Sequence, residues 1–199
     1  MHNLKIYKLE TKFNHVLHDG HAENREVTFT GVGGFLCKHC YEPILADINF
    51  HTLCKIVKPS GSIVTNPITF AVTCSNCNNY TEWHDIPIDP NLVEAISIFN
   101  RKGYKTHMSC EGHSLFARAW ITFYSNMFIV ANKVCMLPYP WQLDEPDDFL
   151  LTSELWRIST GNNICTKRKK IESLLWFANA LPVQEDAPLY NIDKLESDL

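Results

Sequence analysis

Four cysteines in two short pairs are the residues whose types and spacing point most directly to chemistry. Cys37 and Cys40 form one Cys-x-x-Cys pair, and Cys74 and Cys77 form a second, with 33 residues between the two pairs. Each Cys-x-x-Cys turn places two thiolates where both can reach one ion, and two such turns supply four ligands for a tetrahedral zinc site. The sequence therefore predicts a zinc ion held by these four thiolates.

A second group of reactive side chains surrounds a glycine in the middle of the chain. The stretch 109–114, with the sequence SCEGHS, brings a thiol, a carboxylate, an imidazole and two hydroxyls together after a predicted strand. Loops at strand ends, held by a rigid scaffold, are where binding sites are usually built. Gly112 permits a positive φ, and backbone amides in such a turn can form a concavity that binds anions. The predicted ligand-binding residues are Tyr104, His107, Ser109, Cys110, Glu111, Gly112, His113 and Ser114.

The same turn allows two other interpretations. Cys110 could be a nucleophile with His107 or His113 as its base, which would make the protein a Cys/His-dependent enzyme. Neighbours along a chain rarely form a catalytic pair, because a dyad requires a particular geometry rather than proximity in sequence. The turn could also be purely structural, with His113 bonded to a nearby carbonyl. The sequence favours binding without catalysis.

Strands are predicted on both sides of the cysteine turns. Residues 5–13 and 26–30 have strand patterns, and 63–73 and 80–88 form strands before and after the second turn. A strand, a Cys-x-x-Cys turn and a returning strand are typical of a zinc ribbon. The glycines in 31–34 are expected to let the chain turn tightly before Cys37. Because the gap between the pairs is long for a minimal ribbon, we expect a substructure within it.

The C-terminal part alternates helices and strands. We expect a helix that begins at Asp89-Pro90 and ends at Gly103, and a last helix over 166–181. Strands are predicted over 104–110, 119–124 and 155–160, and an acidic, solvated loop around Asp144. The predicted fold class is α+β: a β-rich zinc-ribbon region over 1–86 and a sandwich-like α+β domain, with a ferredoxin-like alternative, over 87–182. Residues 183–199 are predicted to be an acidic, mobile tail.

Composition limits the partners and the cellular compartment expected for the protein. The chain has 199 residues, of which 45% are hydrophobic and 20% charged, and its formal net charge is −4. The negative charge argues against nucleic acid as a partner. We find neither a signal-peptide core at the start nor an apolar run long enough for a membrane helix. Because four of the eight cysteines are assigned to metal, a reducing cytoplasm fits better than a disulfide-forming compartment.

One stretch of the chain carries a family resemblance. Residues 89–93, 102–106 and 109–113, with the sequences DPNLV, KGYKT and SCEGH, resemble small proteins of phages and Gram-positive bacteria that carry this pattern behind a zinc ribbon. The part that includes SCEG is also loosely similar to the methyltransferase family that makes wybutosine in tRNA, although we find no matching S-adenosylmethionine site. The first resemblance implies the cytoplasm of a bacterial host cell as the location and implies no reaction.

Three functions follow as hypotheses. The first is a non-catalytic protein that binds a small phosphorylated, nucleotide-like ligand and, in the setting of the phage resemblance, sequesters a nucleotide signal of bacterial immunity. The cations in 167–170 would help to bind such a ligand, and aromatic residues would stack on it, namely Trp120, Tyr124 and Trp156. The second is an enzyme that uses Cys110, and the third is a zinc-ribbon module that binds protein or nucleic acid. A homo-oligomer is left open.

Overall fold

The structure is a computed structural model. It describes residues 4–7, 9–18, 22–57, 61–64, 70–83, 87–112, 118–125, 130, 136–145, 150, 154–161 and 165–184. Both strands and helices are present, so the α+β class is confirmed. None of the described helices is long and apolar enough to cross a membrane.

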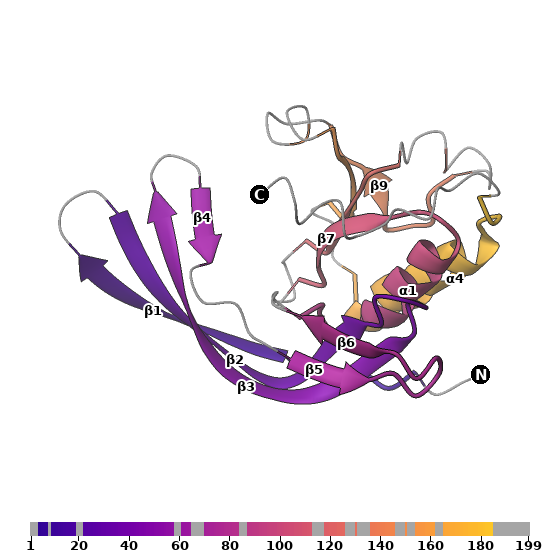
Figure 1. The fold of residues 1–199 in the computed structure, drawn as a ribbon. Helices are drawn as coiled ribbons and strands as arrows, with labels where there is room; N and C mark the ends of the chain where they lie inside the picture. The colour runs from indigo at the N-terminus through magenta and orange to yellow at the C-terminus, as the bar shows by residue number, and fades with distance from the viewer. Residues whose placement is uncertain are drawn as a thin grey trace.

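The N-terminal part is an antiparallel sheet of long strands. Its order follows the chain: β1 (Leu9–His18), β2 (Ala22–Leu36), β3 (Pro43–Val57) and β4 (Gly61–Val64). Strands β2 and β3 pair along their whole length as one hairpin, whose far end projects away from the rest of the molecule together with β1 and β4 (Figure 1). The substructure expected between the cysteine pairs is therefore mainly β3 and β4, which extend this sheet.

The glycines before Cys37 do not make the expected turn, because they lie inside β2. Gly34 forms a two-way backbone bridge with Ile88, each N–H lying 2.8 Å from the other residue's carbonyl oxygen. A Cβ on Gly34 would lie 2.9 Å from the carbonyl oxygen of Ile88 and 2.9 Å from the Cβ of Val93. Glycine is required here because two chain segments approach closely. The predicted division at 86/87 stays a prediction, but these bonds cross it.

A second, short hairpin carries the other pair of cysteines. Strands β5 (Phe70–Thr73) and β6 (Tyr80–Trp83) pair only with each other in the described structure. Val72 of β5 packs against a small cluster formed by Phe35 and Ile48 of the long hairpin. Of the strand predicted over 80–88, Tyr80–Trp83 form β6 and Ile88 forms an isolated bridge with Gly34, while residues 84–86 lie outside the described part of the chain.

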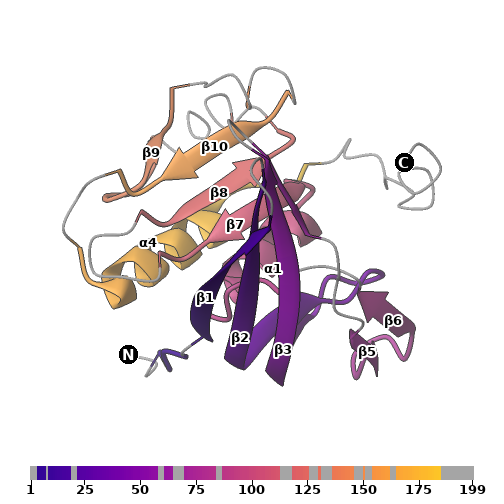
Figure 2. The same ribbon diagram turned by 90° about the vertical axis from the view of Figure 1, so that its left-hand side faces the viewer.

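The C-terminal part consists of two helices against one face of a small sheet (Figures 1 and 2). The sheet order is β7 (Thr106–Cys110), β8 (Trp120–Phe123), β10 (Trp156–Ser159) and β9 (Gln142–Leu143), and every pairing is antiparallel. The helices are α1 (Val93–Arg101) and α4 (Lys167–Ala180). A ferredoxin-like fold contains parallel strands joined through a βαβ unit, so the described pairings do not confirm that alternative.

Aromatic rings join the helices to the sheet. Phe99 of α1 makes edge-on contacts with Phe123 of β8 and Phe177 of α4, with ring centroids 5.1 and 6.1 Å apart. At the end of α4, the ammonium group of Lys102 donates to three backbone carbonyls, those of Ala178, Asn179 and Leu181. A cation at a helix C-terminus complements the helix dipole and satisfies carbonyls that lack intrahelical partners. The two helices are thereby held side by side.

The helix ends differ in how well they follow the sequence. The last helix, predicted over 166–181, is α4 over Lys167–Ala180, and Thr166 caps it, since its hydroxyl accepts the N–H of Lys169. Gly103 follows α1 with a φ of 91°, as expected for a glycine after a helix. The start of α1 was predicted wrongly: residues 89–92 form a turn, the helix begins at Val93, and Leu92 makes no side-chain cap. The carboxylate of Asp89 instead contacts the turn after β7.

Candidate functional site

The two cysteine turns have the same backbone structure, although one joins long strands and the other joins short ones. In the first, Tyr41 N–H donates to Cys37 O (2.9 Å) and Cys37 N–H donates to Glu42 O (3.0 Å). In the second, Asn78 and Asn79 take the places of Tyr41 and Glu42, with both distances 2.9 Å. The residue after each pair is left-handed, with φ of 58° at Tyr41 and 57° at Asn78. Each Cys-x-x-Cys sequence therefore forms the same local turn.

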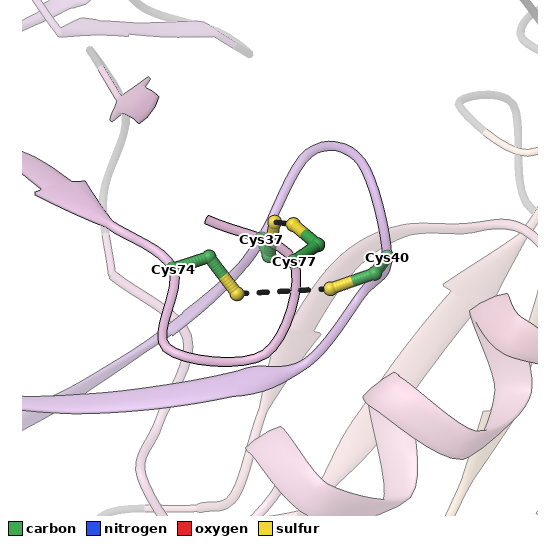
Figure 3. A group of neighbouring side chains, drawn as sticks. All are labelled: Cys37, Cys40, Cys74 and Cys77. Carbon is green, nitrogen blue, oxygen red and sulfur yellow. Dashed lines mark hydrogen bonds between the residues drawn. The ribbon is translucent and has the colours of Figure 1, made fainter. Parts of the chain in front are cut away.

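The two turns bring all four sulfur atoms together (Figure 3). The sulfur atoms lie within 4.8 Å of one another, with 3.6 Å between Cys37 and Cys77 and 3.7 Å between Cys40 and Cys74. A tetrahedral site with zinc–sulfur bonds of about 2.3 Å has sulfur–sulfur edges of about 3.8 Å. A disulfide would require about 2.05 Å. The four cysteines thus form a group that could hold a metal ion, and the exposed His39 is not part of it.

Polar side chains around the sulfurs suit a set of thiolates. Amide groups of Asn76 and Asn79 donate to the sulfurs of Cys40 and Cys77, each at 3.5 Å. The buried hydroxyl of Thr81 lies 3.6 Å from the sulfur of Cys37. Hydrogen bonds of this kind orient metal ligands and stabilise their negative charge.

The metal-free thiols differ in acidity. Burial raises the pKa of Cys37, but hydrogen bonds with the backbone of Cys40 and His39 and with the side chains of Thr81 and Cys77 together outweigh burial and lower the pKa to about 6. The backbone of Asn79 lowers the pKa of Cys77, but burial and the hydrogen bonds with Cys37 and Cys40 outweigh it and raise the pKa to about 11. Without a cation, the thiols therefore share protons, and a bound dication would favour four thiolates.

The first cysteine turn is attached to the C-terminal part through Tyr41. Its carbonyl accepts a hydrogen bond of 2.7 Å from Ser97 of α1, and its hydroxyl accepts one from Lys105. The ammonium group of Lys105 also lies 4.0 Å from the centre of the Tyr41 ring. A non-glycine residue at positive φ costs of order 1 kcal/mol, and these contacts offset that cost. The group of four cysteines is therefore fixed to the helical core as well as to the hairpins.

Glu111, in the predicted ligand-binding turn, points into the protein. Its side chain is 1% exposed and accepts hydrogen bonds of 2.6 Å from Lys167 of α4 and from Asn91. Asn91 in turn pairs with both backbone groups of Tyr7, and Glu111 N–H donates to Asp89 at 2.7 Å. The turn thus joins the N-terminal segment, the start of α1, the end of β7 and the start of α4.

Backbone amides of this turn are already engaged. The N–H of Glu111 binds the carboxylate of Asp89, and the N–H of Gly112 lies 3.5 Å from the sulfur of Cys110. Gly112 has a φ of 75°, as its place in the turn predicted. The turn was expected to bind an anion through its backbone amides. At Glu111 that anion is the carboxylate of Asp89, which belongs to the protein itself. His113 and Ser114 lie outside the described residues.

Cys110 is a weakly acidic thiol. Burial raises its pKa to about 11, and the negative charges of Asp89 and Glu111 act in the same direction, while the N–H of Gly112 opposes them. His107, the proposed base, is exposed, and its ring contacts the ring of Tyr124 with centroids 5.5 Å apart. Tyr104 is buried, and its hydroxyl donates to Pro182 O at 2.9 Å. Ligand binding by these residues stays a prediction.

The four basic residues of the run 167–170 lie in different environments. Lys167 pairs with Glu111, Arg168 pairs with the exposed Glu172 one helical turn on, and Lys169 lies over the ring of Tyr139. Lys170 is buried, and burial lowers its pKa. Lys167, whose charge opposes the dipole of α4, thus has its compensating anion inside the protein.

A group that sequence reasoning missed lies at the ends of β8, β9 and β10. Asp144, expected in a solvated loop, is 5% exposed and accepts hydrogen bonds from Arg118, Arg157 and Ser159. The error has a simple cause: its partners are 13 to 26 residues away along the chain. The available signal was the position of both arginines in or beside predicted strands.

No protein-family model, curated protein or solved structure matches this chain.

Proposed function

We propose that this is a zinc-binding protein in which Cys37, Cys40, Cys74 and Cys77 hold one structural zinc ion. The observation that carries the proposal is the position of four sulfurs within 4.8 Å of one another, at the ends of two hairpins. Four cysteine ligands leave no open coordination position, which is typical of structural rather than catalytic zinc sites. Each pair of cysteines lies at the turn of a hairpin, β2–β3 in one case and β5–β6 in the other. This arrangement supports the zinc-ribbon description of this region.

Metal analysis tests this proposal. Protein purified under reducing conditions is expected to contain about one zinc ion per chain, since a tetrahedral set of four sulfurs suits zinc. The same ligand set also suits iron, so iron must be measured in the same sample. A preparation with stoichiometric iron would contradict the zinc assignment, and one that takes up neither metal after reduction would contradict the site.

We further propose that the protein binds a small phosphorylated ligand without catalysis, and that the end of the β7–β10 sheet near Cys110 is where it binds. The pKa of about 11 for Cys110 argues against an enzyme, because nucleophilic cysteines have lowered pKa values. The nucleotide-like character of the ligand and a role against host immunity stay predictions from the family resemblance. Cytoplasmic location and the homo-oligomer also stay predictions.

Alkylation measures the state of Cys110. With a pKa of about 11, this thiol should have a thiolate fraction at neutral pH about 300-fold smaller than an ordinary cysteine, whose pKa is about 8.5, and should react with iodoacetamide correspondingly more slowly. Its rate should rise with pH without a plateau below pH of about 10. Peptide mass spectrometry would follow the peptide that contains Cys110, with the denatured chain as control. A rate plateau near neutral pH would indicate a reactive thiolate and revive the enzyme hypothesis.

A further inference from the structure

Arg118 is held in one orientation by two buried side chains. Its Nη2 atom donates to the carboxylate of Asp144 at 2.6 Å and to the hydroxyl of Ser159 at 2.7 Å. Ser159 is fully buried and donates to the other oxygen of Asp144 at 2.6 Å. Beside these groups, Thr160 N–H donates to Ala119 O at 2.9 Å and Ala119 N–H donates to the hydroxyl of Thr160 at 3.1 Å, which fixes the chain. The guanidinium plane is therefore set before any ligand arrives.

Most of the hydrogen-bonding capacity of Arg118 remains available. Its side chain is 43% exposed, and within the described part of the chain only Nη2 has an acceptor. Nε and Nη1 can still donate, and a guanidinium group binds carboxylate or phosphate oxygens through two parallel N–H bonds. A buried carboxylate that fixes one edge of the group reduces the entropy lost when a ligand binds the other edge.

Charge distinguishes this position from the turn after β7. Asp144 is surrounded by two guanidinium groups, those of Arg118 and Arg157. In the turn, the carboxylates of Asp89 and Glu111 outnumber the ammonium group of Lys167. The arginine cluster therefore offers an anion the more favourable potential, although the exposed Glu145 beside Asp144 would oppose it.

The cluster lies at the same end of the sheet as the Cys110 turn. Cys110 pairs with Trp120 and Trp120 with Ser159 across the sheet, and Arg118 precedes Trp120 by two residues. Ile121 and Phe123 face the helices, so alternation along β8 places Trp120 on the opposite face. Trp120 is thus two residues from Arg118 in sequence, on the face of the sheet away from the helices. Trp156, another candidate for stacking, packs instead against the core.

We propose that Arg118, oriented by Asp144 and Ser159, binds the phosphate group of a small phosphorylated ligand at this end of the sheet. This inference rests on the proposed ligand-binding function and supplies the net positive charge that the turn after β7 lacks, since two carboxylates there face one ammonium group. Asp144 and Ser159 are positioning residues in this arrangement, because they act through the guanidinium group.

The first test uses the unaltered, zinc-loaded protein. Sodium pyrophosphate or AMP is titrated at constant ionic strength while NMR follows the Nε–H signals of the arginine side chains. The Arg118 signal is expected to shift and saturate, whereas those of the exposed Arg101 and Arg168 should move little. If no arginine signal shifts with either probe, both the ligand-binding function and the role of Arg118 are contradicted. If binding is seen elsewhere and the Arg118 signal is unmoved, only the role of Arg118 is contradicted.

The second test compares two arginine variants that remove the same charge. Arg118→Gln should weaken binding of the probe by about tenfold or more, because it removes two charge-assisted hydrogen bonds. Arg168 is the matched control, since it is 51% exposed and also pairs with one carboxylate. Arg168→Gln should change affinity by about twofold or less, the effect expected of a distant, screened charge. Equal losses in the two variants would show that only net charge matters and would overturn the proposal.

Discussion

Cys74→Ser is expected to abolish metal binding and to release the β5–β6 hairpin from the rest of the protein. Two short strands are marginally stable at best in water. Among the described residues, the apolar cluster that joins this hairpin to β2 and β3 has only Phe35 and Ile48 as buried members. Zinc binding in small metal-bound domains contributes on the order of 10 kcal/mol to folding. The ion, rather than this cluster, should therefore hold the two hairpins together.

Metal content and hydrogen exchange would measure this effect. Zinc should fall from about one ion per chain to background, and amides of residues 70–83 should lose protection while those of α4 and β8 keep theirs. Cys110→Ser is the control, because this half-buried thiol lies outside the metal group and its loss should leave zinc content unchanged. Unchanged zinc in Cys74→Ser, or full protection of residues 70–83 after chelation, would refute a structural metal centre.

Lys167→Met should destabilise the fold by about 2–3 kcal/mol, although it removes a charge that opposes the dipole of α4. The substitution leaves the carboxylate of Glu111, which is 1% exposed, without its cation. Breaking a buried ion pair in this way costs about 3–5 kcal/mol, and a smaller loss is expected here because Lys167 is itself 35% exposed. Denaturant unfolding of the zinc-loaded protein would measure the change.

The next residue in the same helix supplies the control. Arg168 pairs with Glu172, and both side chains are about half exposed. Arg168→Met should therefore change stability by about 0.5 kcal/mol or less. Adding Glu111→Gln to Lys167→Met should recover part of the loss, since it removes the unpaired charge. If Lys167→Met and Arg168→Met cost the same, the Glu111 network contributes little to stability.

Features that depend on a few neighbouring residues were predicted well. The two Cys-x-x-Cys turns and the left-handed Gly103 each depend on backbone geometry within about five residues. The paired turns at 37–42 and 74–79 even share their hydrogen bonds and the sign of φ after the second cysteine. Local sequence thus determined where the ligands lie within each hairpin.

Features that depend on distant partners were predicted poorly. Asp89 was expected to cap α1, but a backbone N–H 22 residues away binds its carboxylate. The glycines at 33 and 34 were expected to form a turn, but they lie in β2, where neighbouring segments come too close for a Cβ. In both cases the residue was correctly predicted to have a specific structural role. The partner that defines this role lies in another part of the chain.

The sequence by itself determined that four thiols meet in two like turns, that the fold mixes strands with helices, and that a polar turn follows β7. Only the tertiary structure decided which charges face inward. The side chains of Glu111 and Asp144 are both buried because cations from α4, from β10 and from Arg118, just before β8, come within hydrogen-bonding distance of them. Burial of a carboxylate is favourable only with such partners, and no local pattern reveals partners that chain folding brings from 13 to 56 residues away.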